Sequence, residues 1–175
     1  VILPFYVQAH ERPKDAEDDR VLLNNVASAH HNLVLSSLLD AATAARQALP
    51  KEALSARYSL QYSIVDKEAE LTGTSLGAAA ALLALTAAAN CYYRLPVYTL
   101  YQNAALTAAI APDGRLLPVD EQGLAVKLQA AFFSPVERVF LARANMPTAL
   151  KIVNQLERRY PKRLLPLHGL EHLNS

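Results

Sequence analysis

Residues 71–89, LTGTSLGAAAALLALTAAA, join a polar segment with one glycine to a long run of alanine and leucine. Alanine and leucine are among the best helix formers, so the sequence predicts a helix from Leu76 to Ala89. The run is shorter than the roughly 20 apolar residues of a membrane-spanning helix, which favours a buried helix. Ser75 stands at its entry, where free backbone N–H groups and the positive helix end could hold an oxyanion. Serine is also a preferred N-cap, so Ser75 could instead serve only to cap the helix.

The segments around this helix show two kinds of apolar pattern, the alternation of strands and the spacing of helices. Residues Arg57–Val65 alternate apolar and polar side chains, which indicates a half-buried strand. Asn32–Ala48 repeats leucine and alanine at helical spacing and precedes Pro50, which is typical past a helix end. By the same criteria we expect strands or extended segments at Val1–Gln8, Val97–Ile110, Leu116–Val119, Val136–Ala142 and Leu164–Leu167. We expect helices at Gly123–Phe133 and Pro147–Tyr160, the latter with Leu150, Val153 and Leu156 inward, and a short helical tail. Loops are expected at Glu11–Arg20 and Asp66–Thr74 and a turn at Pro112–Arg115, while Val21–His31 has no clear state. The order predicts an α+β fold of short strands with about four helices.

The bulk composition limits the function classes. With 175 residues, 52% apolar and 19% charged, the chain can build a core, and we expect a single domain over residues 1–175. A net charge of +1 gives no electrostatic case for nucleic acid or an acidic membrane surface as a partner. A single cysteine, Cys91, fits a reducing compartment, so a cytoplasmic location is expected. Because the sequence begins at Val1 rather than Met, we expect a fragment of a larger protein.

A second segment carries an unusual lysine. Lys127 lies in GLAVKLQAA, residues 123–131, among apolar residues of an expected helix. A lysine beside a buried face can have its pKa lowered by desolvation, which a lysine general base requires. Alternatively, the Lys127 side chain could extend along the apolar surface to solvent.

Histidines offer one further reading. His30, His31, His168 and His172 could suggest a metal, since the last two are four residues apart and would share a helix face. No carboxylate or cysteine cluster accompanies them, so surface histidines are the simpler interpretation and we expect neither metal nor cofactor.

Together these segments resemble the proteolytic domain of Lon proteases. The first segment is similar to the Gly-x-Ser-x-Gly motif of that family through Gly73, Ser75 and Gly77. Residues 139–145 resemble its strand that ends in Pro-x-x-Asn. The family's Thr-Gly-x-Ile, glycine turn, Leu-Pro-Val, glycine and Lys-x-x-Ala-Ala find counterparts at Thr107, Ile110, Gly114, Leu117, Pro118, Val119, Gly123, Lys127, Ala130 and Ala131. The order and approximate spacing hold from Arg57 to Leu173, about two-thirds of the chain.

The resemblance implies a Lon-type fold, like ribosomal protein S5 domain 2, and a serine endopeptidase with a Ser–Lys dyad. It makes Ser75 the nucleophile, Lys127 the general base and Thr107 a threonine that supports the lysine by hydrogen bonding; Gly73, Thr74 and Gly77 form the surrounding loop. It further implies a polypeptide substrate, an ATPase module in the parent chain or a partner, and a homo-oligomer, perhaps a hexamer.

The chain departs from the family pattern in its loops. Thr72 and Thr74 replace the usual Asp and Pro, and Ala108 and Ala109 replace Gly-Glu. The loop before Gly123 is about two residues longer, and residues 91–100 are the expected place of a longer insertion. Two alternatives stay open. One is a catalytically silent Lon-fold module for assembly or binding; the other is a small-molecule kinase of the same broad superfamily, whose loop would hold phosphates.

Overall fold

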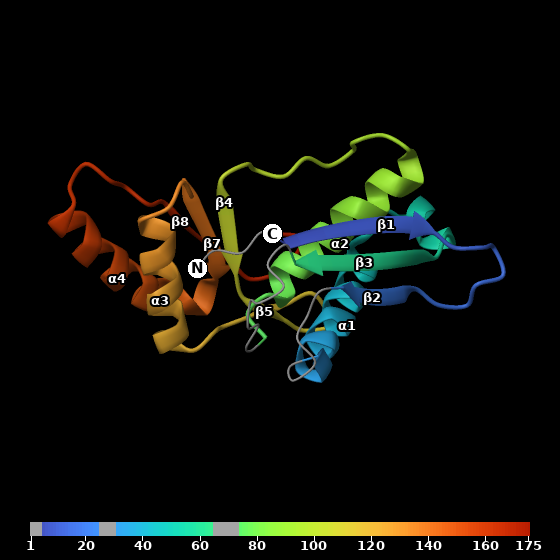
Figure 1. Cartoon of the computed structure of the whole chain (residues 1–175), viewed down its shortest axis with the longest axis horizontal. Coiled ribbons are helices and arrows are strands. Elements are labelled where there is room, and N and C mark those ends of the chain that lie inside the picture. Colours follow the sequence, from blue (N-terminus) through green and yellow to red (C-terminus); the bar gives the residue numbers. More distant parts are fainter. Residues whose placement is uncertain (1–4, 25–30, 65–73) are drawn as a thin grey trace.

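The computed structural model describes residues 5–24, 31–64 and 74–175 and shows a mixed α+β fold with two halves side by side (Figure 1). Four α-helices and three small sheets occur in these residues. In their order along the chain the elements are β1 Phe5–Glu11, β2 Arg20–Asn24, α1 His31–Ala48, β3 Tyr58–Ile64, α2 Gly77–Tyr93, β4 Ala104–Thr107, β5 Ala109–Ile110, β6 Leu116–Leu117, α3 Glu121–Phe132, β7 Arg138–Ala142, α4 Met146–Arg159 and β8 Leu167–Leu170. No helix in the described residues is long and apolar enough to cross a membrane.

The N-terminal half packs α1 and α2 against a three-stranded sheet of order β1-β3-β2. Strand β3 runs antiparallel to β1 and parallel to β2. The predicted alternation of β3 is confirmed, because Tyr58, Leu60 and Tyr62 are buried. The ambiguous region after residue 20 contributes β2, and residues 25–30 lie outside the described part.

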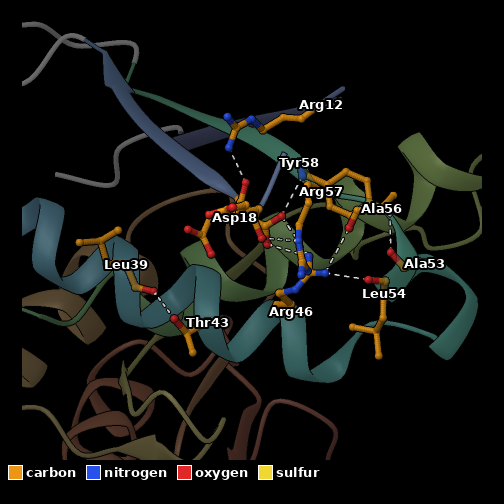
Figure 2. A network of polar contacts seen from close by, with 12 residues as sticks. Arg12, Asp18, Leu39, Thr43, Arg46, Ala53, Leu54, Ala56, Arg57 and Tyr58 are labelled. Carbon is orange, nitrogen blue, oxygen red and sulfur yellow. Dashed lines mark hydrogen bonds and ion pairs between the residues drawn. The ribbon is translucent and has the colours of Figure 1, made fainter. Parts of the chain in front are cut away.

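A polar network fixes the loop between β1 and β2 to this half (Figure 2). The Arg46 guanidinium pairs with the Asp19 carboxylate at 2.9 Å and also donates to the carbonyl oxygens of Leu54 and Ala56. Arg12 donates to the carbonyl oxygen of Asp18. The charged segment 11–20 is therefore mostly exposed, as predicted, but its last carboxylate is a partly buried structural group.

The C-terminal half packs α3 and α4 with the parallel sheet β4-β7-β8. Between the halves, a small apolar cluster of Ala78, Ala108, Leu116 and Ala142 joins the start of α2 to the strands. Three of these four residues are alanines, so backbones from both halves approach closely at this junction.

Several expected elements are wrong or displaced. Residues 97–103, all described, form an exposed connection, and strands begin only at Ala104. The strand expected at Leu164–Leu167 lies further on, as β8 at Leu167–Leu170, and it takes the place of the expected helical tail. The reason is that this segment pairs with β7. Leu150 is 45% exposed rather than inward. Helix α3 begins at Glu121, two residues early, because Asp120 caps it by accepting from the Gly123 N–H.

Candidate functional site

Ser75 is held just before α2 by backbone hydrogen bonds to the junction of β4 and β5. Its carbonyl oxygen accepts from the Ala108 N–H at 3.2 Å, and the Ala78 N–H donates to the Ala108 carbonyl oxygen at 3.1 Å. The N-cap of α2 is Leu76, and no side chain caps this helix. The reading of Ser75 as only an N-cap is therefore wrong, and its hydroxyl is directed elsewhere.

The hydroxyl of Ser75 meets Lys127, which α3 carries from the other half. Lys127 Nζ donates a hydrogen bond to Ser75 Oγ, and both side chains are partly buried. Lys127 therefore does not extend freely to solvent. Desolvation by burial lowers the pKa of Lys127, while the Asp120 carboxylate acts weakly in the opposite direction. The neutral amine is thus favoured more than in an exposed lysine.

The dyad opens into a cleft of about 760 Å³ between the two halves. Its lining is mostly carbon, from residues that include Leu76, Leu83, Leu100, Tyr101, Leu106 and Phe140. An apolar lining with a few convergent polar groups is typical of ligand sites. The size and chemistry suit a stretch of peptide or another elongated apolar ligand.

The other predicted site residues occupy distinct places. Thr107 lines the cleft at the end of β4 and is 8% exposed, but its Oγ1 has no hydrogen-bond partner among the described residues. Its expected bond to Lys127 is not formed here, and its supporting role stays a prediction. Thr74 is exposed, and its carbonyl oxygen accepts from the Gly77 N–H at 3.0 Å. Gly73 lies outside the described residues.

Gly77 packs the start of α2 against β5 and α1. A Cβ at this position would lie 3.2 Å from Ile110 Cγ2, from the Ile110 nitrogen and from Ser37 Oγ. Contacts this close from three directions leave little space for a side chain. The glycine therefore lets the helix that follows Ser75 approach the strand junction.

Some of the backbone N–H groups at the entry of α2 already donate hydrogen bonds within the fold. Those of Gly77 and Ala78 are bonded to the carbonyl oxygens of Thr74 and Ala108. Among the described contacts, the N–H groups of Ser75 and Leu76 make no backbone hydrogen bond. The helix-entry oxyanion site stays a prediction, in which the bonded N–H groups of Gly77 and Ala78 take no part.

Sequence reasoning missed a buried clamp that positions α3. The side chain of Asn145, 5% exposed, accepts from the Val119 N–H and donates to the Val119 carbonyl oxygen, each at 2.9 Å. Val119 directly precedes the N-cap of the helix that carries Lys127. The Asp120 cap could have been found as Asp before a helix, whereas no local pattern reveals which backbone Asn145 binds.

His168 and His172 do not come together as a metal site, and His30 lies outside the described residues. His168 lies on β8 with its ring stacked on Phe140, and His172 Nε2 bonds the Asp113 carbonyl oxygen. The two therefore share no helix face. Across the described part of the chain, no group of three or more His, Cys, Asp or Glu side chains is arranged to hold a metal ion.

No protein-family model matches this sequence, and no curated protein matches it either.

Proposed function

We propose that this chain is a serine endopeptidase of the Lon type, with Ser75 as nucleophile and Lys127 as general base. The observation that carries the proposal is the hydrogen bond between Lys127 Nζ and Ser75 Oγ in an apolar cleft. Ser75 lies just before α2 and Lys127 lies within α3, 52 positions later in the sequence. A capping serine and a solvent-exposed lysine would have no reason to meet.

The chemistry follows from these positions. Neutral Lys127 takes the Ser75 hydroxyl proton as Oγ bonds to the carbonyl carbon of the substrate peptide. The N–H groups of Ser75 and Leu76 hold the negative oxygen. The resulting Lys127 ammonium gives its proton to the leaving amine as the C–N bond breaks, which leaves an ester on Ser75. Water then attacks this ester while Lys127 takes the water proton and returns it to Ser75 Oγ.

Burial contributes by lowering the pKa of Lys127, so that a larger fraction of its amine is neutral at a given pH. A fully solvated lysine is almost entirely protonated at neutral pH and has no lone pair to accept a proton. The lowered pKa of Lys127 raises the fraction of the reactive form. No histidine or aspartate partner is needed in this scheme.

The Lon-type fold is part of the same proposal. Its support is the order of the motifs together with the placement of their members: Ser75 before α2, Thr107 at the end of β4 and Lys127 within α3. A parent chain or partner with an ATPase module, and an oligomeric ring, belong to the proposal only through that likeness.

A serine-reactive probe tests the activity. Folded wild-type protein should be labelled at Ser75 by a fluorophosphonate or peptide boronate, while Ser75→Ala and Lys127→Ala should lose labelling. Lys151→Ala is the matched control, because this lysine is exposed on α4. If folded wild-type protein is not labelled, the peptidase assignment is wrong, and the silent binding module becomes the better reading.

A further inference from the structure

The connection from α2 to β4 is an exposed apolar strap. We define the strap as residues 95–102; Figure 1 shows it running from the far end of α2 back to β4. Its large apolar side chains are between 38% and 68% exposed and are Leu95, Val97, Tyr98, Leu100 and Tyr101. So many neighbouring exposed apolar side chains indicate a surface that binds something.

The path of the strap is fixed. Arg94 and Asn103, which flank it, both have φ of 54°, a left-handed conformation that is uncommon outside glycine. In the middle, the Asn90 side chain donates to the Tyr98 carbonyl oxygen at 3.1 Å and accepts from the Tyr98 N–H at 3.0 Å. This amide clamp mimics a strand partner, so the strap keeps its position without belonging to a sheet.

One aromatic side chain of the strap is held against the C-terminal half. The Tyr101 ring stacks on Phe140 of β7 with 6.1 Å between centroids, and the Arg138 guanidinium lies 4.7 Å from its centroid. Tyr101 nevertheless stays 68% exposed. A side chain that is both exposed and already ordered loses little conformational entropy when a ligand contacts it.

The strap also forms a wall of the catalytic cleft. Leu100 and Tyr101 line the same cleft as Ser75 and Lys127. The described residues that line this cleft include no Asp or Glu. A large apolar side chain entering there gains contact with carbon surface. A basic side chain would lose water without finding an acidic partner in this lining.

We propose that Leu100 and Tyr101 form a subsite that selects substrates by a large apolar side chain in the bound peptide. The inference rests on the proposed peptidase function for the identity of the ligand. It adds which residues choose that ligand.

Binding to a Ser75→Ala protein separates selection from catalysis. The probes are fluorescein-labelled peptides Ala-Ala-X-Ala-Ala-Ala with X as Ala, Asp, Leu or Phe, followed by fluorescence anisotropy. We expect the Leu and Phe peptides to bind most tightly. Adding Tyr101→Ala should weaken Phe-peptide binding roughly tenfold and leave the Ala peptide nearly unchanged.

Two further variants control for indirect effects. Tyr101→Phe keeps the ring and its stacking, so it should retain the preference. Tyr98→Ala removes a similarly exposed tyrosine from the same strap, but this side chain does not line the cleft and binding should not change.

The result that overturns the inference is equal binding of all four peptides, or an unchanged preference in Tyr101→Ala. The outcome is independent of Ser75 labelling. A cleft that selects apolar peptides without being labelled would keep the subsite and reject the peptidase. A labelled protein with no such selection would do the reverse.

Discussion

Removal of the Asn145 side chain should loosen α3, the helix that carries Lys127. In Asn145→Ala, the Val119 N–H and carbonyl oxygen both lose their partner at a site where Asn145 is only 5% exposed. An unsatisfied buried polar group costs about 1–3 kcal/mol. Because Val119 is only partly buried and water can replace part of the loss, we expect the free energy of unfolding to fall by about 2–4 kcal/mol.

Urea unfolding followed by circular dichroism measures this change. With a slope of about 2 kcal/mol per molar urea, the midpoint should fall by about 1–2 M at unchanged slope. The labelling rate of Ser75 should also fall, in urea-free buffer, because Lys127 lies two turns beyond the clamped residue. Thr148→Ala is the control, since its hydroxyl bonds Glu121 on the same helix at 2.9 Å but in an exposed place. Equal small effects of the two variants, below about 0.5 kcal/mol, would refute the reasoning.

Other predictions concern the dyad and the framework. Because desolvation lowers the Lys127 pKa, the unfolded chain binds more protons than the folded chain at pH values between the folded and unfolded pKa. The free energy of unfolding should therefore rise with pH across that window, and so should the rate at which Ser75 is labelled. Lys127→Met should abolish this pH dependence of stability and of labelling. Asp19→Ala removes acceptors for Arg46 and for the Tyr58 N–H and should cost about 2–4 kcal/mol in thermal or urea unfolding. In contrast, Asp113→Ala removes an exposed ion pair and an exposed hydrogen bond from the backbone N–H, both with Arg115, and should change little. Gly114→Ala should cost about 1–2 kcal/mol, since φ is +89° and the new Cβ would lie 2.6 Å from the His172 ring. Thr107→Val should leave stability unchanged or raised, because the hydroxyl has no partner among the described residues, yet slow Ser75 labelling if the threonine supports Lys127.

The sequence predicted elements well where one local signal dominates. Alanine and leucine specify α2, although the helix continues to Tyr93. In contrast, the alternating tyrosines and leucines of residues 97–103 resemble the pattern of a strand, but these residues are exposed, and of them only Leu100 and Tyr101 line the cleft. The helical spacing of His168 and His172 was equally misleading, because pairing of β8 with β7 is a long-range contact that no local pattern contains.

For the site, the pairing of Ser75 with Lys127 was predicted from the ordered resemblance to the Lon pattern, because Ser75 alone also fits an N-cap and Lys127 alone also fits a lysine that reaches solvent. The remaining geometry depends on tertiary contacts. Which N–H groups stay available for an oxyanion is decided by Ala108, whose backbone takes one of them. Likewise, the expected Thr107 bond depends on side-chain orientation, which sequence order does not specify.

The position of the dyad at the junction of the halves has a physical consequence. Ser75 directly precedes α2, which packs in the N-terminal core, while Lys127 lies on α3, which packs in the C-terminal core. Their contact therefore depends on the close approach that Ala78 and Ala108 allow between the halves. We expect a bulkier side chain at either alanine, both 0% exposed, to separate Ser75 from Lys127 before it unfolds either core. Small residues at this junction are thus as necessary to the proposed chemistry as the reacting groups themselves, since a displacement of about 1 Å is enough to disrupt a catalytic geometry.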